Sequence, residues 1–259
     1  MRLMMIDILQ VIAENWKRAP ADQGMKERCL HVVDQTKTSV MDLVNDKAPT
    51  HLLVVWSSID ENERRRHNPM YDVERFDPPM YLFPYLASLE TWFRDMGIRT
   101  AEHSGAESYD LMSLLSEKLK GQGLIMVTPD RRCWSSVSEH CSVIWPWAKS
   151  HLQEVTPSTF AAIMDQSPIE PAAYRDFLLL TTLKGIGPKQ AAGLLRKYGD
   201  IVEIANGLDD ISGRTGNILR SSLKTSDGRS AYRENYPLPI KSLGMRLTEL
   251  ELKEQKLAA

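Results

Sequence analysis

The sequence predicts an α/β fold in which a mainly parallel sheet is flanked by helices and followed by a purely helical region. Two observations lead to this prediction. Short apolar runs alternate with longer amphipathic stretches as far as about residue 165, and strand-like runs stop after that point. Such alternation favours a parallel sheet, because each helix returns the chain to the same end of the sheet. We therefore expect an α/β domain over residues 1–165 and a helical region over residues 166–259.

The predicted strands are four short apolar runs. Leu52–Trp56 and Leu124–Thr128 are the clearest, and the second lies between Gly123 and Pro129. Ser142–Trp145 and Arg2–Ile6 complete the set. Strands of a parallel sheet are covered on both faces, so they read as continuous apolar runs rather than as alternating ones.

The predicted helices carry apolar residues at the spacing of one helix face. In the first domain they cover Met25–Val44, Tyr81–Met96 and Tyr109–Leu119. Residues 58–79 interrupt this alternation with three prolines and no clean periodicity, so we interpret them as a long surface loop or arch with some helix. Residues 171–199 and about 200–257 read as helices, and Leu247–Leu257 forms a charged amphipathic helix suited to packing or docking.

Composition and charge exclude several classes of protein. The 259 residues hold 32 Lys and Arg against 34 Asp and Glu, so an anionic partner has to be held by local basic patches. No apolar run approaches the roughly 18 residues of a membrane span, and Asp7 and Glu14 interrupt the apolar N-terminus, which argues against a signal peptide. Neither the three cysteines nor the six histidines show a zinc-binding spacing. We expect reduced thiols, no membrane partner and a cytoplasmic location, at the nucleoid or in the host cytoplasm if the protein is viral.

The most informative motif is the string LKGIGPKQAA, residues Leu183–Ala192. Its two glycines allow a tight turn whose backbone N–H groups point outward where a helix begins. Such a turn grips a phosphate without reading a base, and nearby lysines add charge. The predicted DNA-binding residues here are Lys184, Gly185, Ile186, Gly187, Lys189 and Gln190. The residues alone also allow a plain helix–turn–helix joint.

The parallel α/β domain, the arch-like loop and this hairpin together resemble the 5′-nuclease family. That family includes flap endonucleases, exonuclease IX and the 5′-nuclease domain of bacterial DNA polymerase I. Besides the hairpin, the sharpest similarity lies in His51–Met80, Ser104–Leu111 and Val127–Asp130. The resemblance implies a PIN-like core with a helix-hairpin-helix (H3TH) module, acting on duplex DNA near 5′ ends, flaps or junctions in replication and repair. It also implies candidate sites for Mg²⁺ among the acids and for K⁺ at the hairpin.

Family members hydrolyse phosphodiesters with two divalent cations held by about seven carboxylates, which stabilise the attacking and leaving oxygens. The acids of this sequence that match the family pattern are Asp7, Glu107, Asp110 and Asp130. At other positions the pattern is broken: Trp56-Ser57 replaces Phe-Asp, Tyr109 replaces a central acid, and Arg132 stands where many members have aspartate.

Two further segments depart from the family pattern. The approach to the hairpin, Phe177–Lys184, lacks the family's aspartates. In the arch, Arg66-His67 and Pro78-Pro79-Met80 match, but a Tyr-Lys pair reads Val73-Glu74, which inverts a charge. Because one lost transition-state contact commonly costs on the order of 3 kcal/mol, we expect a pseudonuclease whose cleavage is lost or strongly weakened. A single Mg²⁺ on the four acids and a residual polar cluster without metal both remain open.

Other charged and aromatic residues have two interpretations. Arg64, Arg65 and Arg66 either contact DNA or pair with acids of their own loop. Arg131 and Arg132 either meet phosphate or neutralise the surroundings of Asp130. The residues Trp134, Trp145 and Trp147 are expected to be core or interface aromatics.

Three functional hypotheses follow. The first, which we prefer, is a DNA-binding protein without efficient cleavage. The second is an active Mg²⁺-dependent 5′-3′ exodeoxyribonuclease that uses the remaining acids. The third is an interaction protein that binds a protein partner through the C-terminal helix.

Overall fold

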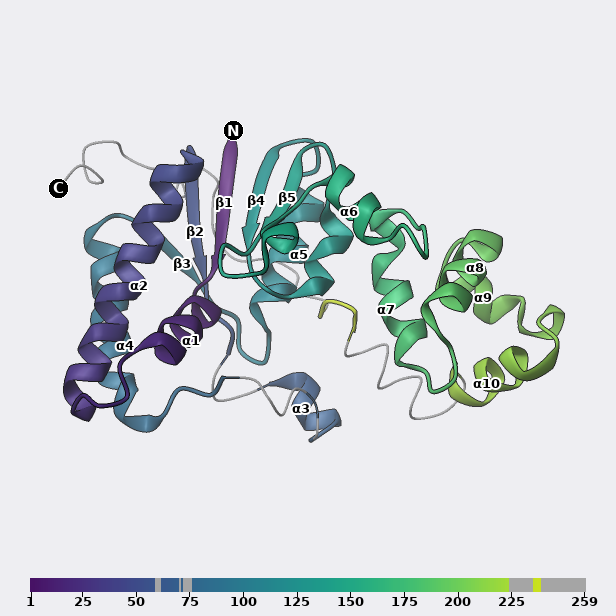
Figure 1. Ribbon diagram of the computed structural model, residues 1–259, viewed down its shortest axis with the longest axis horizontal. Coiled ribbons are helices and arrows are strands. Elements are labelled where there is room, and N and C mark those ends of the chain that lie inside the picture. The colour runs from purple at the N-terminus through teal and green to yellow at the C-terminus, as the bar shows by residue number, and fades with distance from the viewer. Residues whose placement is uncertain (59–61, 70, 72–75, 224–234, 239–259) are drawn as a thin grey trace.

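The computed structural model describes residues 1–58, 62–69, 71, 76–223 and 235–238 of the chain (Figure 1). Within these residues the centre of the fold is a six-stranded sheet with the strand order β3-β2-β1-β4-β5-β6. Neighbouring strands are parallel except for the β5–β6 pair at one edge, which is antiparallel. The strands are β1 (Arg2–Asp7), β2 (His51–Val55), β3 (Arg99–Ala101), β4 (Gly123–Val127), β5 (Cys141–Ile144) and β6 (Glu154–Val155).

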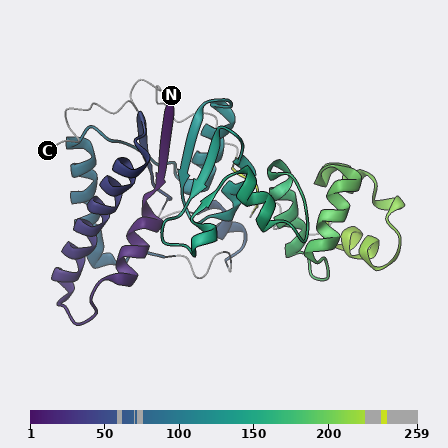
Figure 2. The same cartoon turned by 45° about the horizontal axis from the view of Figure 1, so that its top comes forward.

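Helices cover both faces of the sheet (Figures 1 and 2). On one face lie α1 (Ile8–Arg18), α2 (Met25–Lys47) and α4 (Phe83–Asp95), which is preceded by the 3-10 helix η1 (Met80–Leu82). On the other face lie α5 (Ser108–Lys118) and the 3-10 helix η2 (Arg131–Ser136). Alternate residues of β1 divide between the two layers, with Met4 and Ile6 on the first face and Leu3 and Met5 on the second. This double burial explains why the strands read as unbroken apolar runs.

A short helix, α3 (Glu63–His67), lies in the expected arch segment. The side chain of Asn62 caps it by accepting hydrogen bonds from the backbone N–H groups of Arg64 and Arg65. The N–H of Glu63 donates to the carbonyl of Gly105 at 3.0 Å, so α3 is seated beside the loop that leads into α5. The expected departure at Val73-Glu74 lies outside the described residues.

The 3-10 helix η3 (Ser150–Leu152) lies between β5 and β6. After β6 the described chain is helical, and its elements are α6 (Pro157–Ile163), the 3-10 helix η4 (Pro171–Ala173), α7 (Tyr174–Thr182), α8 (Pro188–Tyr198), α9 (Ile201–Asn206), the 3-10 helix η5 (Leu208–Asp210) and α10 (Gly213–Leu223). We call residues 171–223 the helical region. Stacked rings join it to the α/β part, because the ring centroids of Trp134 in η2 and Tyr174 in α7 lie 5.3 Å apart.

The predicted fold class is confirmed, and all four predicted strands are present within about one residue of their expected bounds. Sequence reasoning missed β3 and β6 because these edge strands have only three and two residues, with exposed positions that leave no continuous apolar run. It also missed α1, which follows β1 directly. The predicted helix Leu247–Leu257 lies outside the described residues. Among the helices that the structure describes, none has the length and apolar character needed to cross a membrane.

Candidate acid cluster and nucleic-acid interface

Four acidic side chains lie at the end of the sheet where the parallel strands have their carboxyl ends, and we call Asp7, Glu107, Asp110 and Asp130 the acid cluster. Asp7 ends β1, and Asp130 follows the end of β4 by three residues. Glu107 and Asp110 lie at the start of α5, where the N–H of Glu107 donates to Asp110 Oδ2 at 2.8 Å. The carboxyl ends of parallel strands collect functional groups at a common edge, which explains why the sequence brings these acids together.

Thr128 connects two members of the acid cluster. Its hydroxyl donates to Asp7 Oδ2 at 3.0 Å and accepts from the N–H of Asp130 at 3.2 Å. At the neighbouring strand end, where the family pattern has aspartate, Ser57 accepts a hydrogen bond from the N–H of Ser108 at 2.9 Å. The serine therefore ties the end of β2 to the start of α5 and supplies no carboxylate.

The side chain of Arg64 reaches from α3 into the acid cluster. Its Nη1 lies 2.8 Å from Asp110 Oδ2 and its Nη2 lies 2.6 Å from Asp110 Oδ1, a bidentate pair. Its Nη1 also lies 3.4 Å from Glu107 Oε2. Arg64 is 1% exposed and Asp110 is 0% exposed, so this pair is shielded from water.

A second guanidinium, that of Arg132 from η2, joins the cluster from the side of β4. Its Nη2 lies 2.6 Å from Glu107 Oε2, and its Nε lies 3.0 Å from each carboxylate oxygen of Asp130. Its guanidinium carbon lies 4.4 Å from the centroid of the Tyr109 ring, a favourable cation–π position. Arg132 thus neutralises the surroundings of Asp130, one of its two expected roles.

Uncharged side chains complete the hydrogen bonding of Glu107. Asn62 Nδ2 donates to Glu107 Oε1 at 2.8 Å, and the hydroxyl of Tyr71 donates to Glu107 Oε2 at 3.1 Å. The same hydroxyl accepts from Arg132 Nη1 at 2.7 Å. Burial raises the pKa of Tyr71 above its ordinary value, so the hydroxyl keeps the proton that it donates.

Backbone from a distant part of the chain covers the Arg64–Asp110 pair. The N–H of Leu238 donates to Asp110 Oδ1 at 2.9 Å, and Arg64 Nη2 donates to the carbonyl of Tyr236 at 2.8 Å. The hydroxyl of Tyr109 donates to the carbonyl of Asn235 at 2.9 Å. We call residues 235–238 the covering segment.

These contacts fix the charge of the cluster. Burial alone would raise the pKa of Glu107, but the charges of Arg132 and Arg64 outweigh it and hold that pKa at about 2, below the ordinary 4.5. Burial likewise opposes the charge of Arg132, yet Asp130 and Glu107 raise its pKa well above the ordinary arginine value. Both arginines and Glu107 therefore remain charged at neutral pH.

The acid cluster does not fit a divalent cation in this arrangement. Mg²⁺ requires near-octahedral oxygen ligands at about 2.1 Å, whereas oxygens of Glu107, Asp110 and Asp130 contact guanidinium nitrogens at 2.6 to 3.0 Å. Throughout the described ranges, no group of three or more His, Cys, Asp or Glu residues is placed to hold a metal ion. The expectation that Mg²⁺ occupies these four acids therefore finds no support in the geometry.

The three arginines of the arch have different surroundings. Arg65 pairs with Asp77 at 3.0 Å and Arg66 with Glu63 at 3.3 Å, both on the surface. Arg64, by contrast, is buried in the acid cluster. The expectation that Arg64 contacts DNA is corrected here, because a guanidinium shielded from water and paired with two carboxylates cannot meet a phosphate at the surface.

The predicted hairpin joins α7 to α8. Leu183 and Ile186 are buried, and between them Gly185 has φ +99°, a conformation that other residues rarely adopt. Helix α8 begins at Pro188, and the first of its N–H groups to bond within the helix is that of Ala191, which donates to Gly187 at 2.9 Å. The N–H groups of Lys189 and Gln190 precede that bond and lie at the positive end of the helix dipole. The side chains of Lys184, Lys189 and Gln190 are exposed.

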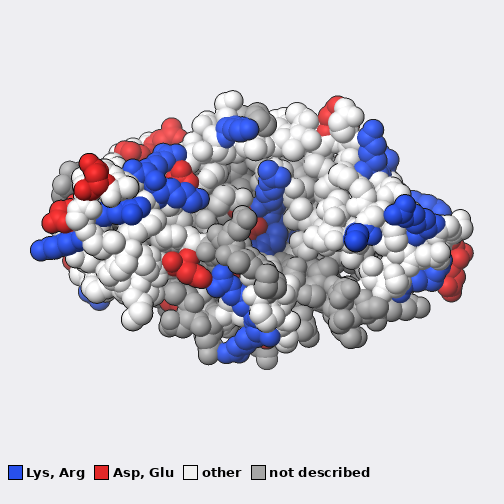
Figure 3. All heavy atoms as spheres, turned by 60° about the horizontal axis from the view of Figure 1, so that its bottom comes forward, with Lys and Arg blue, Asp and Glu red and all other residues white. Residues whose placement is uncertain are grey.

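Sequence reasoning missed the part that α10 plays beside this hairpin. A Cβ added at Gly185 would lie 2.9 Å from Ile218 Cδ1 and 3.9 Å from Arg214 Nη2, so the first turns of α10 lie against the turn. Gln190 Nε2 also donates to Thr215 Oγ1 at 3.4 Å. Arg214 is exposed and adds a cation to the two lysines. The glycines Gly213 and Gly216 at the start of α10 were the feature of the sequence that could have indicated this close contact. In Figure 3, Lys and Arg side chains are prominent over the helical region, at the right of the view.

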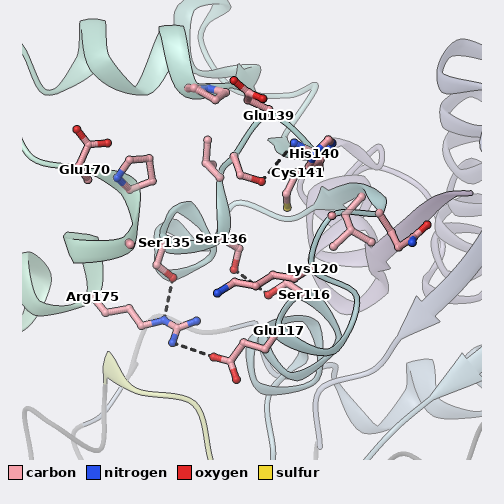
Figure 4. Close-up of a pocket in the computed structure, with 18 residues that line it drawn as sticks. Ser116, Glu117, Lys120, Ser135, Ser136, Glu139, His140, Cys141, Glu170 and Arg175 are labelled. Carbon is pink, nitrogen blue, oxygen red and sulfur yellow. Dashed lines mark hydrogen bonds and ion pairs between the residues drawn. The ribbon is translucent and has the colours of Figure 1, made fainter.

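A pocket of about 660 Å³ lies near the amino ends of β4 and β5, away from the acid cluster (Figure 4). Arg175 of α7 crosses it, donating to Ser135 Oγ at 2.8 Å and approaching Glu117 at 3.5 Å. The side chain of Lys120 also points into the pocket. These contacts tie the helical region to η2 and α5, so we interpret the pocket as part of the junction between them.

Comparison with known proteins agrees with the observed fold. The chain matches the family model described as 5′-3′ exonuclease, N-terminal resolvase-like domain, over residues 2–165. The flap endonuclease Xni of Shewanella denitrificans is 24% identical over 261 residues, covering 97% of this chain and 97% of its own length. DNA polymerase I of Mycobacterium bovis is 25% identical over 194 residues, which is 71% of this chain but only 21% of the polymerase. The chain thus spans about a fifth of that relative.

A solved structure with a similar fold comes from bacteriophage T5. It is the pseudo-enzyme–product complex of a flap endonuclease with DNA and metal ions, with a TM-score of 0.64 and 14% identity. The match covers 91% of this chain and 88% of that chain. At this identity the likeness shows a shared fold.

Proposed function

We propose that this chain, which belongs to the 5′-3′ exonuclease family, is a DNA-binding protein that holds duplex DNA near a 5′ end, flap or junction and cleaves it weakly or not at all. Membership follows from the family model, whose match covers residues 2–165. In this proposal residues 1–165 form the nuclease-like domain and residues 166–259 the DNA-binding region. The flap endonuclease and polymerase relatives support a role in DNA replication or repair.

Support for DNA binding comes from the hairpin. Binding of a phosphate at such a turn requires a backbone of defined shape and an accessible start of a helix. Gly185, Gly187 and Pro188 supply both. Lys184 and Lys189 are exposed beside that helix start, and Arg214 adds a third cation from α10. Contacts of this kind bind the phosphate backbone without base specificity. The candidate K⁺ site at this turn remains a proposal.

The observation that carries the loss of cleavage is the pair of guanidiniums inside the acid cluster. Two-metal hydrolysis needs carboxylates that are free to hold cations against the attacking and leaving oxygens. Here Arg64 and Arg132 contact the carboxylates of Glu107, Asp110 and Asp130. Each lost electrostatic contact to a transition state commonly costs about 3 kcal/mol, so several together remove useful catalysis.

The binding part of the proposal is tested with a nicked duplex that carries a fluorescent 5′ flap. We expect salt-sensitive binding by fluorescence anisotropy, and we expect Lys184→Ala/Lys189→Ala to weaken it and to reduce the salt slope by about 2. Lys26→Ala, an exposed lysine on α2 at the opposite end of the molecule, is the matched control (Figure 1). Binding that responds equally to the hairpin pair and to the control would contradict this assignment.

An active divalent-metal-dependent 5′-3′ exodeoxyribonuclease is the second candidate function. It is favoured by the fact that all four matching acids lie at one sheet edge, joined by Thr128, Arg132 and Arg64. This candidate predicts Mg²⁺- or Mn²⁺-dependent release of 5′ nucleotides that Asp110→Asn and Asp130→Asn abolish. The first candidate predicts that bound DNA remains intact.

A further inference from the structure

We infer that Arg64 and Arg132 are built-in counter-cations of Glu107, Asp110 and Asp130, so that the chain itself occupies these carboxylates and this end of the sheet takes no divalent cation. The inference rests on the proposed function in one respect, because it concerns the same site and explains why cleavage is absent there. It goes further by naming the guanidinium groups that occupy the site and the contacts that hold them there.

The two guanidiniums bridge the acids in an unbroken series. Arg132 joins Asp130 to Glu107, and Arg64 joins Glu107 to Asp110. Glu107 is thus shared by both cations, much as a bridging carboxylate is shared by two metal ions. Each arginine presents several N–H donors in a fixed plane, which satisfies two carboxylates at once.

Each guanidinium is also held from outside the acid cluster. Arg132 stacks on the Tyr109 ring and donates to the hydroxyl of Tyr71. Arg64 donates to the carbonyl of Tyr236 in the covering segment, and its backbone N–H is capped by Asn62. A metal ion would have to displace these two guanidiniums, which are held by Tyr71, by Tyr109 and by the covering segment.

Displacement would also leave buried charges without partners. Arg64 and Asp110 are fully shielded from water, so expelling the guanidinium requires that α3 lift away from α5 or that the charge remain inside unpaired. Removing one partner of a buried ion pair is strongly unfavourable. The guanidiniums therefore exclude a metal ion by occupying the carboxylates that would bind it. The Arg64–Asp110 pair also holds α3 against α5.

The chain offers a matched pair of variants for the test. Arg64→Gln/Arg132→Asp removes both guanidiniums and adds a carboxylate two residues from Asp130. The control Arg66→Gln/Arg131→Asp makes the same changes of charge at exposed neighbours, one in α3 and one in η2. Both double variants keep all four acids.

The readout is the electron paramagnetic resonance signal of free Mn²⁺, recorded while protein is added without DNA. The wild-type chain and the control variant should leave this signal unchanged, and Arg64→Gln/Arg132→Asp should deplete it in a saturable way. If the wild-type chain binds Mn²⁺ and both Glu107→Gln and Asp110→Asn abolish that binding, the inference is overturned. Wild-type binding that survives both substitutions lies elsewhere and leaves it standing.

The wild-type measurement decides the question even if the double variant does not fold. If the double variant folds, as judged by circular dichroism, and binds no Mn²⁺, the claim that the arginines exclude the metal is wrong. DNA binding measured in chelator is independent of all these outcomes. Failure of this inference and failure of the proposed DNA binding are therefore distinguishable.

Discussion

The acid cluster and the hairpin are two polar regions that differ in how their polar groups are satisfied. In the acid cluster, the charged groups face one another: Arg64, Arg132, Glu107, Asp110 and Asp130 form a closed network with little exposure. In the hairpin, the side chains of Lys184 and Lys189 face solvent. One region has its electrostatic needs met within the fold, and the other still presents groups that can meet a ligand.

The two regions suit binding and metal-dependent catalysis through different kinds of residue. In the proposed function, hairpin binding depends on the backbone shape at Gly185, whose φ is +99°. Metal-dependent catalysis depends on several carboxylates at once, and one arginine that reaches them alters the whole site. A member of this family can therefore keep the first capacity while the second is reduced.

The largest expected effect is on the free energy of unfolding, and it arises at the acid cluster. Arg64→Ala should lower the free energy of unfolding by about 3–5 kcal/mol, because it leaves the buried carboxylates of Asp110 and Glu107 without their counter-charge. Arg66→Ala, on the same helix but exposed, should change it by no more than about 1 kcal/mol. Urea unfolding followed by circular dichroism measures both. Equal losses in the two variants would mean that the acid cluster is not closed by Arg64.

The next effect is expected at the hairpin. Gly185→Ala should cost about 1–2 kcal/mol and weaken flap binding, because φ is +99° and the new Cβ would lie 2.9 Å from Ile218 Cδ1. Gly193→Ala is the control: it lies within α8 with open space around its Cα, and alanine there should stabilise the helix by up to about 1 kcal/mol. Thermal unfolding and anisotropy together separate the two positions. A Gly185→Ala variant that binds DNA normally would contradict the proposed role of the turn.

The free energy of unfolding should depend on pH through Glu107 of the acid cluster. The pKa of Glu107 is depressed to about 2 in the folded state, against an ordinary value of 4.5. The stabilisation from this carboxylate is therefore fully present above pH 4.5 and is lost as the pH falls towards 2. Urea unfolding of the wild-type chain across this window should show the loss, and Glu107→Gln should show less of it. An identical pH dependence in both proteins would remove Glu107 as its source.

The smallest expected effect is on the rate of alkylation of a thiol next to the acid cluster. Cys133 follows Arg132 in η2 and is fully buried, and burial raises its pKa well above the ordinary value, so it should resist alkylation in the native protein. Arg132→Ala should speed its alkylation, because η2 loses its attachment to Glu107. Cys29, buried on the other face of the sheet, serves as the internal control. Mass spectrometry of timed iodoacetamide reactions reads both sites, and equal acceleration would indicate general unfolding instead.

Much of the fold could be predicted from the sequence, because burial on both faces of the sheet leaves unbroken apolar runs such as Leu52–Val55. The four acids could be named because they match acids of the 5′-nuclease pattern. Arg132 could be expected to neutralise Asp130 because it is only two residues away. Arg64 could not be placed, since its contact with Asp110 spans 46 residues and depends on how α3 is seated.

The contacts of Tyr71 and of the covering segment depend on tertiary structure in the same way. The carbonyl of Tyr236 is 172 residues from Arg64, and neither residue carries a local signal of that contact. The basic run Arg64–His67 and the prolines that follow suggested a surface segment, and Arg65 and Arg66 do lie at the surface, within the short helix α3. One residue of that run nevertheless turns inward, and no periodicity in so short a helix could identify it.

The most direct test of the difference between the two regions is one time course with a 5′-flap duplex, in which bound and cleaved DNA are measured together in chelator, in Mg²⁺ and in Mn²⁺. We predict the same bound fraction in all three conditions and intact DNA throughout. Cleavage that requires the metal and disappears in Asp110→Asn would contradict the account, because it would show that the acid cluster still opens to hold catalytic cations.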